Sequence, residues 1–330
     1  MLKRIIRGLL PLVAVFVTLS PQQSALAKCM DTPGLSVLSS RPCTSEDLAK
    51  GSLAGYGASG HHLLWTVTGP RGSAYLLGSL HFGKPEMFPL PAEMTQAFEA
   101  SKALVVETNI GALDPERIAK SVAAKGMYSD GTTLSQVLNP ATWKELEQVM
   151  KGFGTSAKVL ERQKPWLVSL TLTSLALKRF GFDEDLGIDK HFMELANNNK
   201  KPIIELETFE QQLEFLNGFS TAEQEDMLKE TIDELEKGRS FLVDVLRAWQ
   251  VGDAQEIDRL MNEEFRETSK TDEHMYQVLI TERNAAMVDK LDALLNEGGN
   301  YFVVLGAAHF VGSDGIVELL KAKGYRVQQH

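Results

Sequence analysis

Two short motifs in this chain place a histidine soon after an apolar run. The first reads Leu76-Leu77-Gly78-Ser79-Leu80-His81-Phe82-Gly83, and the second reads Val304-Leu305-Gly306-Ala307-Ala308-His309-Phe310-Val311-Gly312. An imidazole can bind a metal ion or move a proton near neutral pH, although a single histidine is also a common structural hydrogen-bond donor. Because the two copies occur in matched contexts, we predict that His81 and His309 share one site at the rim of a sheet.

Acidic residues also follow apolar runs. Glu107 comes directly after Ala103-Leu104-Val105-Val106, a run typical of a strand covered on both faces in a parallel sheet. Ligands gather at the carboxyl ends of such strands, so we expect Glu107 near His81. Glu205 and Glu207 share one face of a later strand because side chains alternate. Either a cation or proton lies between these two carboxylates, or Glu207 simply begins the next helix.

Two further polar residues have alternative interpretations. Asp189 falls where a helix N-cap is expected, so capping is its first explanation. Arg283, in the sequence Glu282-Arg283-Asn284, is either an exposed helix residue or an inward cation. An inward guanidinium would orient a carboxylate or stabilise an oxyanion. The spacing alone does not decide between these roles.

The surrounding pattern predicts the elements that must position these residues. Gly69-Pro70-Arg71-Gly72 separates two strand-like runs and is typical of a hairpin. Other strand patterns occur near 103–106, 203–207, 301–305 and 324–327, and helical patterns fill the intervals. The apolar run 166–177 is too short to span a bilayer and is typical of a buried helix. We predict an α/β fold with a central mixed, partly parallel sheet flanked by helices. A large helical insertion, at about 114–295, contains one strand near 203–207.

The N-terminal segment has the pattern of a cleavable export signal. A basic start is followed by an apolar run and by Ala25-Leu26-Ala27. We therefore predict a signal peptide at 1–27, a periplasmic or secreted mature chain and no transmembrane span. In an oxidising compartment the two cysteines predict a Cys29–Cys43 disulfide, which would pin an irregular arm at 28–60. Residues 61–330 are expected to form one domain.

Charge and motifs exclude several function classes. The formal net charge is −10, and removal of 1–27, which contains only basic charges, makes the mature chain more acidic. An acidic surface repels phosphates, so nucleic acid is not an expected partner. The chain contains no P-loop, G-x-S-x-G or H-E-x-x-H motif. Nothing in the sequence therefore supports classical nucleotide, serine-hydrolase or zincin chemistry.

The ordered set of motifs resembles the TraB/GumN family, which is related to the Tiki proteins of animals. The matching segments are Gly78-Ser79-Leu80-His81, Val105-Val106-Glu107, Gly187-Ile188-Asp189, Glu205-Leu206-Glu207-Thr208, Glu282-Arg283-Asn284, Gly306-Ala307-Ala308-His309 and Gly324-Tyr325. The resemblance implies a compact α/β fold and a metal-dependent hydrolytic activity, shown as proteolysis for the Tiki branch. The wider fold group also includes erythromycin-esterase-like hydrolases and haem-binding ChaN-like proteins.

The residues agree with a metal hypothesis. Two imidazoles and a carboxylate suit a divalent Zn²⁺, Mn²⁺ or Co²⁺ ion, and an open coordination position would activate water toward a carbonyl. We predict His81, Glu107 and His309 as ligands, Glu207 as general base and Arg283 as orienter or oxyanion partner. Which histidine binds metal and which moves a proton stays open, so His309 is also a catalytic candidate.

The leading hypothesis is an exported metal-dependent hydrolase, a peptidase acting on an amide bond in a peptide or on a small amide or ester. The alternative is a non-catalytic cell-envelope protein that binds a peptide or haem in the same cleft. A third interpretation is a structural envelope protein whose paired motifs only stabilise the sheet.

Overall fold

The computed structural model describes residues 61–235, 238–266 and 269–330. The predicted signal peptide, the arm at 28–60 and the Cys29–Cys43 disulfide lie outside the described residues. None of the helices in the described ranges combines the length and hydrophobicity needed to cross a bilayer.

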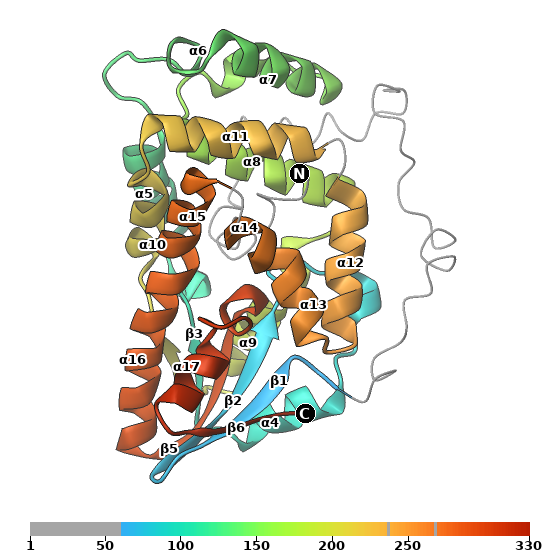
Figure 1. Cartoon of the computed structure of the whole chain (residues 1–330), viewed down its shortest axis with the longest axis vertical. Helices are drawn as coiled ribbons and strands as arrows, with labels where there is room; N and C mark the ends of the chain where they lie inside the picture. The colour runs from blue at the N-terminus through green and yellow to red at the C-terminus, as the bar shows by residue number, and fades with distance from the viewer. Residues whose placement is uncertain (1–60, 236–237, 267–268) are drawn as a thin grey trace.

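The described strands form one mixed sheet of six strands, which lies in the lower half of the view in Figure 1. The strands are β1 Leu64–Thr68, β2 Gly72–Ser79, β3 Ala103–Val106, β4 Ile203–Glu205, β5 Gly299–Gly306 and β6 Arg326–Gln329. Their order is β4-β3-β5-β2-β1-β6. β4, β3, β5 and β2 run parallel, whereas β1 is antiparallel to both β2 and β6. The prediction of a mixed, partly parallel α/β sheet is confirmed.

The local sequence explains the central strands. All four residues of β3 are buried, as its apolar run predicts. The last six residues of β5 are also buried. β1 and β2 form the expected hairpin, in which the backbone N–H of Gly69 donates to the carbonyl of Gly72 at 2.9 Å. The parallel core therefore places the carboxyl ends of β2, β3 and β5 at one edge.

Helices cover both faces of the sheet. The longer ones are α4 Ala92–Ala100, α5 Pro115–Gly126, α7 Pro140–Gly152, α8 Pro165–Arg179, α9 Ile188–Asn198, α10 Phe209–Asn217, α11 Thr221–Leu235, α12 Gly238–Gln250 and α16 Glu282–Glu297. The shorter ones are α6 Leu134–Val137, α13 Ala254–Asp258, α14 Glu264–Arg266, α15 Lys270–Tyr276 and α17 Ile316–Ala322. α4 and α9 meet β5 through Phe98, Phe192 and Phe302, while α16 and α17 cover the opposite face (Figure 1).

Two π-helical segments interrupt the C-terminal helices. They are Arg259–Glu263, which follows α13, and Gln277–Thr281, which leads directly into α16. The helical pattern of the sequence did not predict these interruptions. Such segments are rare and often lie at functional sites. Both adjoin the second histidine motif, because Asn262 donates to the carbonyl of Ala308 and Thr281 donates to Asp314.

Candidate functional site

The ends of β2 and β5 bring the two histidine motifs side by side. The strands are neighbours and parallel, with Gly78 opposite Leu305 and Ser79 opposite Gly306. Each strand ends just before its histidine, so both chains leave the sheet at the same edge. β3 lies on the other side of β5 and is followed by Glu107. One carboxylate oxygen of Glu107, Oε1, accepts the backbone N–H of Gly306 at 2.7 Å, which ties the third strand end to the second motif.

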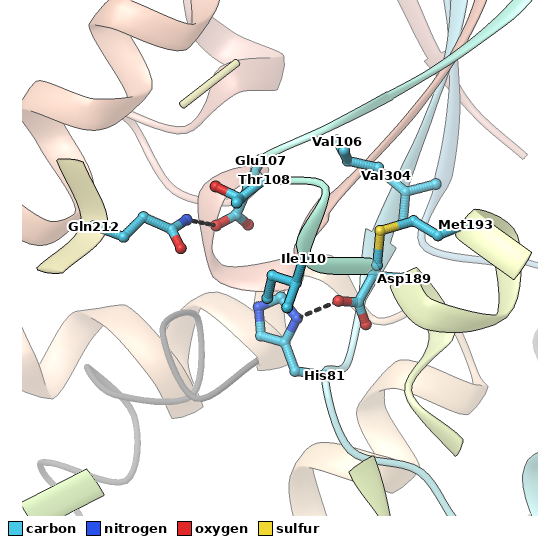
Figure 2. A pocket seen from close by; sticks show the side chains of 9 residues that line it. All are labelled: His81, Val106, Glu107, Thr108, Ile110, Asp189, Met193, Gln212 and Val304. Carbon is cyan, nitrogen blue, oxygen red and sulfur yellow. Dashed lines mark hydrogen bonds and ion pairs between the residues drawn. The ribbon is translucent and has the colours of Figure 1, made fainter. Parts of the chain in front are cut away.

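Asp189 holds the imidazole of His81. The Nδ1 atom of His81 lies 2.9 Å from Oδ2 of Asp189 in a buried pair (Figure 2). An ionised carboxylate only accepts hydrogen bonds, so Nδ1 carries the hydrogen in this pairing. The predicted N-cap role of Asp189 is wrong: α9 begins at Ile188, its N-cap is Gly187, and the Asp189 side chain turns to the histidine instead. A Cβ at Gly187 would lie 2.5 Å from the carbonyl oxygen of His81, so glycine permits this close approach.

Asn284 holds the imidazole of His309. The Nδ1 atom of His309 lies 2.6 Å from Oδ1 of Asn284, and the histidine side chain is completely buried. Burial, followed by the charges of Arg283 and His81, lowers the pKa of His309 well below its ordinary value, so the ring is neutral. Its Nε2 atom is buried without a hydrogen-bond partner and lies 3.9 Å from Oε1 of Glu107. That separation is too long for a hydrogen bond.

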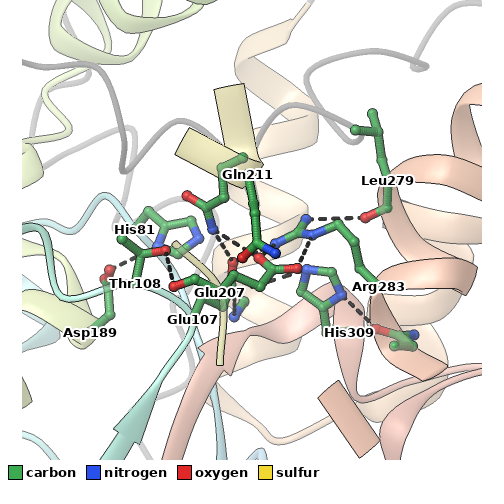
Figure 3. A network of polar contacts seen from close by, with 12 residues as sticks. His81, Glu107, Thr108, Asp189, Glu207, Gln211, Leu279, Arg283 and His309 are labelled. Carbon is green, nitrogen blue, oxygen red and sulfur yellow. Dashed lines mark hydrogen bonds and ion pairs between the residues drawn. The ribbon is translucent and has the colours of Figure 1, made fainter. Parts of the chain in front are cut away.

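Arg283 joins the two buried glutamates (Figure 3). Its Nε and Nη2 donate to the two carboxylate oxygens of Glu207 at 2.8 and 2.7 Å, and Nη2 also donates to Oε2 of Glu107 at 2.8 Å. Its Nη1 donates to the carbonyl of Leu279 at 3.1 Å. Burial alone would raise the pKa of Glu207, but the charge and hydrogen bonds of Arg283 outweigh burial and lower it. Arg283 is thus an inward cation that bonds to both carboxylates.

A small cavity opens beside these groups (Figure 2). His81, Glu107, Thr108, Asp189 and Gln212 form its polar wall, and Val106, Ile110, Met193 and Val304 form its apolar wall. Its volume of about 20 Å³ is room for one water molecule or ion. Oδ1 of Asp189 and Oε1 of Gln212 are buried acceptors that have no hydrogen-bond partner. The wall is therefore rich in acceptors and suits a cation or a hydrogen-bond donor.

Gln212 also belongs to the site, although the sequence did not single it out. It projects from α10, and its Nε2 donates to Oε2 of Glu207 at 3.1 Å and to Oε2 of Glu107 at 3.3 Å. α10 begins after Thr208, whose hydroxyl caps the backbone N–H of Gln211. Thr208 is therefore the N-cap of α10, while Glu207 turns inward to Arg283. Glu205 is exposed and accepts the backbone N–H of Asn109, so the two acids of this strand do not share a cation.

The donor types at this edge fit a divalent metal in part. The neutral His309 offers an unpartnered Nε2 near Glu107, and each imidazole is held at Nδ1 by an oxygen of another side chain, as metal-binding histidines are. Within the described ranges, however, no three His, Cys, Asp or Glu side chains are grouped as ligands of one ion. The chain thus presents donors of the right kind without a complete ligand set in this conformation.

Comparison with known proteins gives two kinds of match. A model of the TraB/PrgY/gumN family matches residues 63–329. The uncharacterized protein YbaP of Escherichia coli K12 is 25% identical over 276 residues, which cover 79% of this chain and 94% of YbaP. Metalloprotease TIKI2 of Danio rerio is 24% identical over 314 residues, covering 80% of this chain but only 60% of TIKI2. No solved structure matches the chain.

Proposed function

Because this chain belongs to the TraB/PrgY/gumN family, we propose that it is a metal-dependent hydrolase, with peptide amide bonds as its substrates. The observation that carries the proposal is the unpartnered Nε2 of a neutral, buried His309 beside Glu107, at a strand edge shared with His81. The metalloprotease names of the TIKI relatives support the same reaction class.

His81, Glu107 and His309 are the residues that would hold the ion. A divalent metal, when bound, lowers the pKa of a water molecule and polarises the substrate carbonyl. The identity of the metal among Mn²⁺, Co²⁺ and Zn²⁺ is a matter for direct analysis. Asp189 and Asn284 fix the directions of the two rings, and the guanidinium of Arg283 holds the carboxylate of Glu107 in place.

We assign the proton acceptor differently from the sequence prediction. A carboxylate bound at both oxygens to a guanidinium is a weak base, and this is the state of Glu207. Asp189 lines the cavity, and it has one oxygen on His81 and a second oxygen without a hydrogen-bond partner. Asp189 is therefore better placed to take a proton from water, while Glu207 positions Arg283 and, through it, Glu107.

The small cavity has the size of an ion site rather than of a haem pocket. Ligand cavities for drug-sized molecules and cofactors measure several hundred Å³. The cavity beside His81 has room for about one water molecule or ion.

We also propose that the mature chain is exported after cleavage near Ala27. N-terminal sequencing of protein recovered from the cell envelope or medium tests that cleavage.

The experiment that tests the function combines metal analysis with cleavage of a fluorogenic peptide library. We expect metal-dependent turnover that chelation abolishes, and a loss of at least about 100-fold in His81→Ala and His309→Ala. His274→Ala is the matched control, because this exposed histidine pairs with Glu223 away from the site. Turnover that resists chelation contradicts the proposal. Tight binding of intact peptide without turnover favours the alternative of a non-catalytic binding protein. If the two alanine variants do not fold and the wild-type protein binds no ligand, the structural interpretation is favoured.

A further inference from the structure

Asn284 links the second histidine motif to α16 through both ends of its side-chain amide. Its Oδ1 lies 2.6 Å from Nδ1 of His309, and its Nδ2 donates to the backbone carbonyl of Asp314 at 2.9 Å. We propose that Asn284 is a positioning residue that fixes the tautomer of His309, with the hydrogen on Nδ1 and the lone pair on Nε2. The expected effect on activity rests on the proposed function, whereas the expected tautomer of His309 does not.

The orientation of the amide follows from its two partners. A backbone carbonyl only accepts hydrogen bonds, so the nitrogen of Asn284 must face Asp314. The oxygen then faces His309, and an amide oxygen only accepts. The ring nitrogen beside it must therefore donate. A hydrogen on Nε2 instead would leave two acceptors, Nδ1 and Oδ1, facing each other at 2.6 Å.

The carbonyl that orients Asn284 is itself held in place. The carboxylate of Asp314 accepts the hydroxyl of Tyr276 at 2.8 Å and the hydroxyl of Thr281 at 2.6 Å. Thr281 ends the π-helical segment and directly precedes α16, which carries both Arg283 and Asn284. These hydrogen bonds hold the loop after His309 against the start of α16. The Asp314 carbonyl that orients the amide of Asn284 therefore has a fixed position.

The tautomer decides what the site can bind. Nε2 of His309 is the atom that faces Glu107, and it is buried without a partner. With the hydrogen on Nδ1, this atom is an acceptor for a metal ion or a donor group. With the hydrogen on Nε2, the ring would donate toward Glu107 and could not bind a cation at that nitrogen.

Nitrogen NMR tests the proposal directly, on protein that is labelled with ¹⁵N-histidine and freed of metal with a chelator. Two-bond ¹H–¹⁵N correlations distinguish the two neutral tautomers, and His309→Gln identifies the signal of His309 by its loss. We expect a neutral ring with the hydrogen on Nδ1. A hydrogen on Nε2 in the wild-type protein overturns the proposal, whether or not the enzyme proves active.

Variants of Asn284 separate positioning from general stability. Asn284→Leu should lose the single tautomer and weaken metal affinity and kcat by about 10- to 100-fold. Asn284→Asp keeps the acceptor that faces His309 and should retain the hydrogen on Nδ1, at a cost in stability because its second oxygen cannot donate to the Asp314 carbonyl. Asn262→Leu is the matched control, because this buried amide bonds to the Ala308 carbonyl rather than to the ring. An unchanged tautomer in folded Asn284→Leu contradicts the proposal, and if that variant does not fold, the wild-type and Asn284→Asp spectra still decide.

Discussion

Among the individual residues, Arg283 connects the two buried glutamates and leaves little of its guanidinium for a substrate. Its donors reach Glu207, Glu107 and the Leu279 carbonyl, and the side chain is 1% exposed. Burial disfavours the charged guanidinium, but the two carboxylates outweigh it and raise the pKa of Arg283. The oxyanion role considered from the sequence would require breaking one of these bonds, so the orienting role is the better supported one.

The first prediction concerns the removal of this buried cation. Arg283→Met leaves Glu107 and Glu207 buried without their shared counter-ion, which should lower the free energy of unfolding by about 3–5 kcal/mol. Urea denaturation at pH 7 measures the loss. Part of it should return in the double variant Arg283→Met, Glu207→Gln, because one of the uncompensated charges is then absent.

An exposed ion pair provides the control for Arg283. Arg117 pairs with Glu210 at 2.8 Å, and its side chain is 59% exposed. Arg117→Met should change stability by at most about 1 kcal/mol. Equal losses in Arg117→Met and Arg283→Met would show that the buried cluster contributes no more than a surface pair.

For single residues, the sequence indicated the candidates better than their partners. His81, Glu107, Glu207 and His309 stand out because their polar side chains follow or interrupt apolar runs, whereas the sequence left Arg283 with two alternative roles. Their pairings are long-range: Asp189 is 108 positions from His81, and Glu107 is 176 positions from Arg283. No local pattern determines such contacts, which is why Asp189 was interpreted as a helix cap and Gln212 was missed.

At the scale of elements, a close contact between two loops sets the position of the first histidine. Gly83 and Asp183 form an isolated antiparallel bridge, with both N–H···O distances at 2.9 Å. The bridge holds the loop after His81 against the segment that leads into α9 and Asp189. Strand ends were predictable from apolar runs, whereas this loop pairing, like the π-helical segments, depends on tertiary contacts that the local sequence does not encode.

The second prediction tests the loop contact. A Cβ at Gly83 would lie 1.9 Å from the backbone oxygen of Leu186, so Gly83→Ala must push the two loops apart. We expect a loss of about 1–3 kcal/mol in unfolding free energy and reduced activity, because His81 and Asp189 separate. Gly152→Ala is the control: Gly152 ends α7, a Cβ added there would meet no neighbouring atom within 4 Å, and alanine should stabilise by at most about 0.5–1 kcal/mol. Equal stability of the two variants would contradict the prediction.

Within the part of the chain that the structure describes, two hydrophobic cores share α8. Leu167 and Leu170 belong to the core around the sheet, whereas Val168 and Leu172 belong to a smaller core with α6, α7 and α11. Figure 1 shows α6 and α7 farthest from the sheet, with α8 and α11 between them. The prediction of a buried helix was made from composition alone, because residues that are apolar all round must be covered on every side. The second core could not be predicted, since it depends on how α11 returns across α8.

The third prediction concerns the pH dependence of the whole fold. The ring of His191 on α9 packs against the rings of Phe88 and Phe192, with both centroid separations at 5.2 Å. Burial lowers the pKa of His191 below the ordinary value of 6.5, with a smaller opposing contribution from Glu194. His62 is also lowered, again chiefly by burial. Between these lowered pKa values and pH 6.5, the unfolded chain therefore binds more protons than the folded one.

The unfolding free energy must consequently fall as the pH drops through that window, and it should be fully retained above pH 6.5. Replacing His191 by Leu keeps an apolar contact with the two phenylalanines and removes one titrating group. The slope of unfolding free energy against pH, measured by urea denaturation from pH 7.5 to 5, should become shallower in His191→Leu without vanishing. His62 and the buried His309, whose pKa values are also lowered, still contribute. An identical slope in the two proteins would mean that His191 has the same pKa in the folded and unfolded chains. That result would contradict the effect expected from its packing against two aromatic rings.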